Sequence, residues 1–314
     1  RPVEYSLKND CIRYTIYGDV QPNPTVKNVE DALLIYKSHE CDCLIAVGGG
    51  SSIDCAKAIS ARVAYPQRPI SRMKGILRVL RKVPTLIAVP TTAGTGSETT
   101  LASVITDSDT HHKYAIMSFP LIPRYAVLDA KLTYSLPKNL TATTGMDALT
   151  HATEAYIGRS TTSETRQLAV DAVRLIFNNI KAAYSDGENE FARKNMLIAA
   201  YKAGIAFSKS YVGYIHAIAH SLGGQYGIPH GLANSVIMPY VLEAYGKKAH
   251  KKLYRLAIAA GVCSENDSIE VGAKKYIDAI KNLNKEMNIP DKLGGIIKED
   301  IPIMARYAEK EANP

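Results

Sequence analysis

The chain has 314 residues, of which 46% are hydrophobic and 22% are charged, with a formal net charge of +8 at pH 7. This length predicts about two domains, and the composition is typical of folded cores and argues against disorder. Polar or charged residues interrupt each apolar run before the ~18 residues of a membrane span, so no membrane association is expected. Five cysteines without a CxxC pair predict free thiols in a reducing compartment.

The first half of the chain is predicted to alternate strands with helices. Period-two alternation predicts the first strand, and short continuous apolar runs predict two later strands that are covered on both faces. Strands that run into glycine turns and then helices favour a parallel sheet of α/β type. The expected strands cover 12–16, 44–47, 86–89 and 126–128, and the expected helices cover 26–36 and 53–59.

The pattern changes after Pro137, where period-two segments end. Apolar residues between Leu168 and Phe177 form one broad helical face, and a turn containing two glycines and a proline is expected within 223–229. We therefore predict an α/β domain over residues 1–137 and an all-helical domain over residues 138–314.

Each of the two continuously apolar strands ends in a glycine-rich turn, at 48–51 and at 90–97. Backbone N–H groups at the end of a strand and the start of a helix form an anion site, and hydroxyl side chains add donors. The first turn is not a G-x-G-x-x-G fingerprint, and one tight turn alone is common in parallel sheets. Two such turns at the same edge favour a nucleotide phosphate.

The histidines of the second half suggest a metal site. Asp147 and His151 are four residues apart, as are His216 and His220, so each pair lies on one helix face. A single histidine on an apolar helix is more often a hydrogen-bonded core residue. Four histidines, including His230, together with an aspartate on helices that pack together favour a metal site instead. Imidazole and carboxylate ligands favour Fe²⁺ or Zn²⁺ over Ca²⁺ or Mg²⁺.

These features lie in four stretches: GGGSSIDCAK at 48–57, PTTAGTGSE at 90–98, GMDALTHATEA at 145–155, and HAIAHSLGG followed by IPHGLAN over 216–234. In this order they resemble the signature stretches of the iron-containing (group III) alcohol dehydrogenases. The resemblance spans nearly the whole chain. It implies a dehydroquinate synthase-like architecture, in which a dinucleotide-binding α/β domain with a parallel Rossmann-like sheet precedes an all-α metal-binding domain.

The resemblance also implies roles for individual residues. His220 would lie beside the metal near the nicotinamide as a non-ligand, and we expect it to act as a catalytic proton relay or positioning group, with a purely hydrogen-bonding role as the alternative. Glu154 shares the face of Asp147; it could orient a ligand, but a salt bridge within the helix is the favoured interpretation. The implied metal ligands are Asp147, His151, His216 and His230, and the implied cofactor contacts are Gly49, Gly50, Ser51, Asp54, Thr91, Thr92, Thr95, Thr100 and Lys113.

The implied activity is hydride transfer between a small primary alcohol, diol or hydroxyaldehyde and NAD or NADP. The substrate oxygen, as alkoxide or carbonyl, would bind Fe²⁺ or Zn²⁺ in the cleft between the domains. A cytoplasmic, fermentative enzyme that forms a homodimer or a larger homo-oligomer is expected. The alternatives are a hydroxyacid–oxoacid transhydrogenase, a dehydroquinate-synthase-like lyase, or an inactive truncated metal-binding chain. Segments rich in Ala, Leu, Gly and Ser around the predicted ligands favour a small, weakly charged alcohol over the phosphorylated acid of the lyase.

The chain differs from the family pattern at both ends. The family has a strand and a helix before the segment equivalent to 12–16, and further helix after the equivalent of Pro314, so both are expected to be missing here. The missing strand would carry the acidic residue that helps to select NAD over NADP.

A run of six basic residues between Arg68 and Lys82 contains no acid. No aromatic residue is interleaved within the run, which favours a solvated loop and helix face over a nucleic-acid site.

Overall fold

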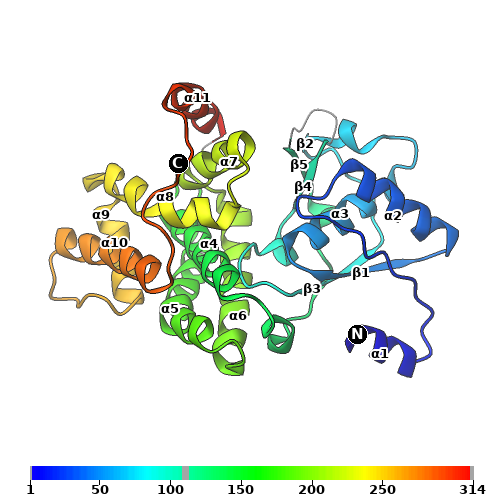
Figure 1. Cartoon of the computed structure of the whole chain (residues 1–314), viewed down its shortest axis with the longest axis horizontal. Helices are drawn as coiled ribbons and strands as arrows, with labels where there is room; N and C mark the ends of the chain where they lie inside the picture. The colour runs from blue at the N-terminus through cyan, green and yellow to red at the C-terminus, as the bar shows by residue number, and fades with distance from the viewer. Residues whose placement is uncertain (1, 108–112, 312–314) are drawn as a thin grey trace. The chain divides into compact units, whose positions relative to one another are not determined.

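The computed structural model describes residues 2–107 and 113–311. The chain divides into two compact units, drawn in Figure 1. Unit 1 comprises Arg1–Val89 and Leu101–Ala126, and unit 2 comprises Pro90–Thr100 and Val127–Pro314. The second glycine-rich turn therefore packs with the helical unit, although it directly follows a strand of unit 1.

Among its described residues, unit 1 contains two three-stranded sheets. The first has the order β1 (Cys43–Gly48), β3 (Thr85–Pro90) and β6 (Tyr125–Ala126), and β3 and β6 run parallel with Ile87 opposite Tyr125. In the second, β5 (Lys113–Met117) lies between β2 (Gly75–Ile76), which is parallel to it, and β4 (Ala102–Thr106), which is antiparallel. The predicted strands at 44–47 and 86–89 are confirmed, and so is the parallel α/β character of this region.

Two helices pack in unit 1 as the sequence pattern predicts. They are α2 (Val26–Ser38) and α3 (Gly50–Ala64), and α3 contacts α2, β1 and β4. A capping box formed by Thr25 and Asn28 starts α2. The apolar faces of both helices join β4 and β5 in one core; its members include Val29, Leu33, Cys55, Ala58, Ile59, Ile105 and Ile116. This core fixes the start of α3, and with it the first glycine turn.

The strand predicted at 12–16 is wrong. Ile12 and Ile16 are 52% and 58% exposed, and this segment pairs with no strand among the described residues. A strand needs a neighbouring strand for its backbone N–H and C=O groups, and alternation alone cannot provide one. The strand expected at 126–128 is shorter than predicted, since β6 ends at Ala126. The short strands β2, β4 and β5 were not predicted, because two to five residues carry little periodicity.

From Val127 to Glu311 the described part of unit 2 consists of helices and turns, and the all-helical character predicted for 138–314 is confirmed. Within α7 the backbone stays helical through Gly223 and Gly224, so the expected turn is shorter and begins at Gly227, whose φ is +66°. The long helices are α4 (Lys138–Ile157), α5 (Ser163–Ser185), α6 (Glu190–Ser210), α7 (Tyr214–Tyr226), α8 (His230–Tyr245), α9 (Lys247–Ala259), α10 (Ile269–Glu286) and α11 (Ile301–Glu311).

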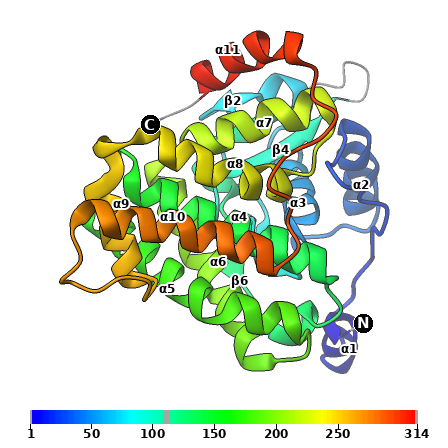
Figure 2. The same cartoon turned by 60° about the vertical axis from the view of Figure 1, so that its left-hand side comes forward.

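Helix α4 is the centre of unit 2. It packs against α5, α6, α7, α8 and α9, and Figure 2 shows it among them. Every residue from Gly145 to Ala155 is buried, which is why this helix has no polar face of the kind that surface helices show. Polar side chains in this stretch therefore lie in the core and need partners there.

The remaining helical segments are short. They are α1 (Pro2–Asn9) and the 3-10 turns η1 (Ile70–Met73), η2 (Ser97–Thr99), η3 (Phe119–Leu121), η4 (Ala130–Thr133) and η5 (Lys298–Asp300).

No helix in the described part of the chain has both the length and the apolar character needed to cross a membrane.

Two glycines let the second glycine-rich turn approach α6 closely. Gly96 has a φ of +61°, and a Cβ there would lie 2.7 Å from the Cα of Gly204. A Cβ on Gly204 would in turn lie 2.3 Å from Oγ1 of Thr99. Backbone therefore packs directly on backbone at this point, and neither position has room for a side chain.

We predict that Gly96→Ala lowers the free energy of unfolding by about 2–4 kcal/mol, because alanine adds left-handed strain and a backbone clash. Gly224→Ala is the matched control: it lies inside α7 with no atom within 4 Å of the new Cβ and should stabilise by up to about 1 kcal/mol. Urea unfolding followed by circular dichroism measures both. Equal midpoints for Gly96→Ala and the parent would contradict the packing described here.

Candidate metal centre

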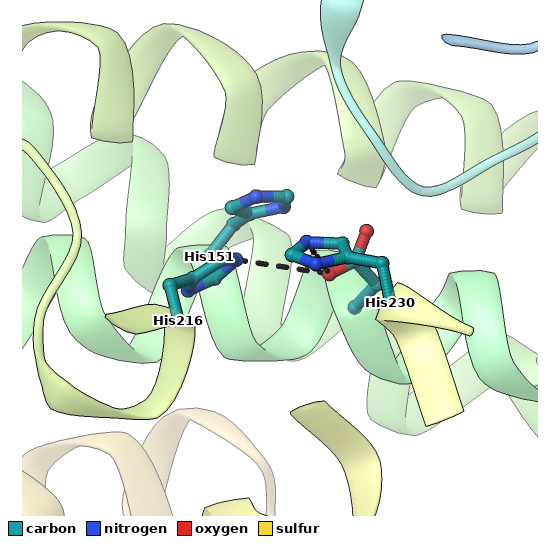
Figure 3. Close-up of side chains that lie close together, drawn as sticks. His151, His216 and His230 are labelled. Carbon is teal, nitrogen blue, oxygen red and sulfur yellow. Dashed lines mark ion pairs between the residues drawn. The ribbon is translucent and has the colours of Figure 1, made fainter. Parts of the chain in front are cut away.

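Three helices of unit 2 bring four potential metal ligands together. Asp147 and His151 are one turn apart on α4, His216 lies in the first turn of α7, and His230 is the first residue of α8. Each offers one ligand atom, and these atoms all lie within 4.8 Å of one another. Figure 3 shows His216 and His230 directed towards the same point, with His151 beside them.

Asp147 lies between two of the rings. Its Oδ1 is 3.4 Å from Nε2 of His230 and 3.7 Å from Nε2 of His216. The same oxygen accepts a hydrogen bond of 2.7 Å from Nδ2 of Asn234. Asn234 was missed in the sequence, although its position four residues after His230 places both on one face of α8.

Ring stacking fixes the orientation of His151. The ring of Phe207 lies on it at 4.1 Å between centroids, and the ring of His216 at 4.4 Å. The backbone carbonyl of Gly94, in the second glycine-rich turn, lies next to His151 and partly offsets the effect of burial on its pKa. The turn and this histidine are therefore neighbours within unit 2.

Glu154 contacts His216 rather than a residue of its own helix. It is 2% exposed; its Oε2 lies 2.6 Å from Nδ1 of His216, and its Oε1 accepts a hydrogen bond of 2.7 Å from the backbone N–H of Ile215. The favoured expectation of a salt bridge within the helix is wrong. Its spacing of seven residues from Asp147 puts both carboxylates on one face of α4, but this spacing alone does not identify His216 as its partner.

Two nitrogens of this group have no hydrogen-bond partner among the described residues: Nδ1 of His151 and Nε2 of His216. A buried polar atom without a partner costs free energy. Two imidazole nitrogens without hydrogen-bond partners, beside the Asp147 carboxylate, are the donor set that divalent first-row metals bind once the proton of His216 is displaced. The residues present therefore fit a metal ion of this class.

The ionisation of the group follows from its burial. Burial lowers the pKa of His151 to about 4, and burial together with the neighbouring rings lowers that of His230 to about 3. Burial also acts on His216, but the carboxylates of Asp147 and Glu154 outweigh it and raise its pKa to about 9. Burial opposes ionisation of Asp147, yet His151, His230 and His216 lower its pKa far below the usual range.

Models of one protein family match almost the whole chain. The model described as "Iron-containing alcohol dehydrogenase" matches residues 1–130, and the model described as "Fe-containing alcohol dehydrogenase family, C-terminal" matches residues 141–314. The chain belongs to the iron-containing alcohol dehydrogenase family.

Individual members of the iron-containing alcohol dehydrogenase family are similar over nearly the full chain. The 1,3-propanediol dehydrogenase of Klebsiella pneumoniae is 38% identical over 98% of the chain and 80% of its own length. The NAD-dependent methanol dehydrogenase of Bacillus methanolicus is 39% identical over 98% of the chain and 81% of its own length. A crystal structure of 1,3-propanediol oxidoreductase has a TM-score of 0.95 at 38% identity, covering 99% of the chain and 81% of its own.

His220 lies beside the four donors but outside their group. It is exposed, its ring stacks on that of His230 at 5.1 Å between centroids, and it meets the ring of His216 edge-on at 6.0 Å. Its Nδ1 lies 2.5 Å from Oε1 of Glu311 on α11. Glu311 was not predicted to belong to the site.

The predicted cofactor residues of unit 1 lie around the start of α3. Gly49 is the residue before the helix, and Gly50 and Ser51 begin it. Asn23 connects two of the predicted contacts: its backbone N–H donates to Oγ of Ser51, and its Oδ1 accepts from Nζ of Lys113. Asp54 lies one turn further along α3, and its Oδ2 accepts the backbone N–H of Val104 on β4.

The predicted cofactor residues of unit 2 lie in the second glycine-rich turn. Thr91, Thr92 and Thr95 are partly exposed, and Oγ1 of Thr95 accepts the backbone N–H of Ser97. Thr100 is 5% exposed and donates to the carbonyl of Ser97. The hydroxyls of the first three are therefore the more accessible donors of this turn.

The basic run of unit 1 is exposed, as expected for a solvated face. Four of its arginines line a cavity of about 520 Å³, and the guanidinium groups of Arg68 and Arg81 lie 5.0 and 4.7 Å from the ring centroid of Tyr65. Tyr65 precedes the run and was not considered with it. Its ring is thus already covered by two of the run's own side chains.

The pKa pattern predicts how metal binding to the metal-free chain depends on pH. Since His216 alone carries a raised pKa of about 9, a metal ion must displace one proton from it. The affinity for Zn²⁺ should therefore rise about tenfold per pH unit from about pH 7 and level off near pH 9. His151 and His230, with pKa values of about 4 and 3, are already neutral there and add no slope.

Competition with a chromogenic chelator at constant ionic strength measures this dependence. A Zn²⁺ affinity that does not change between about pH 7 and pH 9 would contradict the ionisation described for His216.

Proposed function

We propose that the chain is a metal-dependent dehydrogenase that transfers a hydride between a small primary alcohol, diol or hydroxyaldehyde and NAD or NADP. The observation that carries the proposal is the group of one carboxylate and three imidazoles on α4, α7 and α8, of which all but the partly exposed His230 are buried. Family membership supports it, as do relatives named for 1,3-propanediol and methanol. The name of the second relative also supports NAD as the acceptor.

We propose Fe²⁺ as the ion, with Zn²⁺ as the alternative. Asp147, His151, His216 and His230 would hold it. When bound, such an ion is a Lewis acid that polarises the oxygen of an alcohol or carbonyl. One carboxylate and three neutral imidazoles neutralise only half of its double charge, which leaves the group electrophilic.

The lining of the site supports a small substrate of low charge. Helices α7 and α8 contain no lysine or arginine, and the single basic residue of α4 is Lys138 at its first position. A phosphorylated acid needs guanidinium or ammonium partners, which these three helices do not offer. This absence favours an alcohol or aldehyde over the substrate class of a dehydroquinate-synthase-like lyase.

The glycine turns would bind the dinucleotide. Gly49 and Gly50 leave the backbone N–H groups at the start of α3 free of side chains, and a helix N-terminus favours a phosphate. The hydroxyls of Thr91, Thr92 and Thr95 would add donors. The nicotinamide must then face the four donors, because hydride moves between it and the carbon next to the polarised oxygen.

His220 would move the proton that leaves the alcohol. Its Nδ1–H donates to the carboxylate of Glu311, which fixes the ring and leaves Nε2 to exchange the proton. Its exposure gives that nitrogen access to solvent. A positioned general base of this kind contributes about 10²- to 10⁴-fold.

We predict that His216→Ala and His220→Ala separate metal binding from proton transfer. In anaerobically prepared protein with Fe²⁺ or Zn²⁺, His216→Ala should lose more than about 100-fold in metal affinity, because a ligand contributes more than its outer partners do, and NADH formation should cease. His220→Ala should keep the metal, while turnover falls by about 100-fold or more. His250→Ala on α9 is the control and should match the parent.

The assay is NADH formation across short alcohols and diols, with metal content measured on the same samples. Parent protein that binds metal and NAD but oxidises none of these alcohols would contradict the proposed activity. Unchanged metal content in His216→Ala would contradict the ligand assignment.

A further inference from the structure

Glu154 is a buried carboxylate that joins α4 to the start of α7. We propose that it is the positioning residue of His216: it holds the proton on Nδ1, keeps Nε2 directed at the other three donors, and thereby sets the metal affinity of the site. The inference rests on the proposed ligand role of His216.

The two oxygens of Glu154 have separate partners. Oε2 lies 2.6 Å from Nδ1 of His216, and Oε1 accepts the backbone N–H of Ile215 at 2.7 Å. Since the side chain is 2% exposed, water does not compete for either oxygen. An ionised carboxylate only accepts hydrogen bonds, so Nδ1 keeps its proton, and the proton that a metal ion displaces is the one on Nε2.

The backbone around Gly213 keeps the carboxylate in place. Gly213 precedes α7, and a Cβ at this position would lie 2.9 Å from Oε1 of Glu154. The carboxylate therefore lies against the first turn of α7, where negative charge is favoured. One side chain of α4 thus fixes both the start of α7 and the ring carried by that first turn.

Both oxygens are needed because both partners are donors. A glutamine has one oxygen and one NH₂ group at this position. If its oxygen faced Ile215, the NH₂ group would face Nδ1 of His216 and force the proton onto Nε2, where it would occupy the metal-binding lone pair. If its oxygen faced His216, two donors would meet at Ile215. The first arrangement loses the Nδ1–H tautomer of His216, and the second loses the hydrogen bond to Ile215 at the start of α7.

Thr153, the preceding residue of α4, offers a matched control. Its hydroxyl is buried and forms a 2.8 Å hydrogen bond with the hydroxyl of Tyr276 on α10. Thr153→Val removes a buried hydrogen bond from the same helix without changing the group that faces His216. Any loss of Zn²⁺ affinity that Glu154→Gln shows beyond this control is specific to the contact with His216.

The test compares the parent chain, Glu154→Gln and Thr153→Val. Zn²⁺ affinity is measured by chelator competition, and the His216 Nδ1–H resonance is recorded by NMR of ¹⁵N-histidine protein with and without Zn²⁺. Glu154→Gln should lose about 10- to 100-fold in affinity and lose the strongly hydrogen-bonded, downfield Nδ1–H resonance. Thr153→Val should keep both, although its melting temperature falls. Glu154→Asp keeps the carboxylate but shortens the side chain by one methylene, which moves the charge away from His216. It should therefore recover part of the Zn²⁺ affinity that Glu154→Gln loses.

Parental affinity together with a parental Nδ1–H resonance in Glu154→Gln would overturn the positioning role. If Glu154→Gln does not fold, Gly213→Ala replaces it, because the new Cβ displaces Oε1 while the carboxylate stays; unchanged affinity and resonance there would equally overturn the proposal. Failure of the proposed function has a different signature. The parent would then bind no metal, while the Nδ1–H resonance of the metal-free protein would still report whether Glu154 holds the ring.

Discussion

The constraint on which the helical unit depends is the burial of two carboxylates on one helix. Asp147 and Glu154 are each 2% exposed within the fully buried stretch of α4. A buried carboxylate is costly unless hydrogen bonds and opposite charge compensate it. The compensation comes from α7 and α8, through His216, His230 and Asn234. The same contacts that make α4 stable at the centre of the unit therefore collect the metal-ligand candidates around it.

His216 links these two carboxylates. Its two ring nitrogens face Glu154 and Asp147 respectively, which explains why its pKa lies above the usual value of histidine while those of His151 and His230 lie below theirs. Without a metal ion, the proton on Nε2 supplies the positive charge that the carboxylates require. A divalent ion can replace that proton with a larger charge at nearly the same place. The two carboxylates alone therefore already favour a positive charge at the point where a metal ion would bind.

The group of potential metal ligands could be predicted in part from the sequence because Asp147 and His151 are four residues apart and therefore share one face of α4. The glycine turns are recognisable from their composition, and their role in cofactor binding stays a prediction. Glu154 could not be assigned, because its partner is 62 residues away in the sequence and only packing brings them together. The strand expected at 12–16 failed for a related reason: alternation describes one chain segment, whereas a strand also requires a neighbour.

The division of the chain gives the second glycine-rich turn an additional role. Pro90–Thr100 follows a strand of unit 1 but packs in unit 2, where Gly96 meets Gly204 on α6. In the same turn the carbonyl of Gly94 lies next to His151. A segment whose composition indicates phosphate binding therefore also packs beside the group of potential metal ligands. A change in the backbone of this turn would change the surroundings of His151, because the two are neighbours in unit 2.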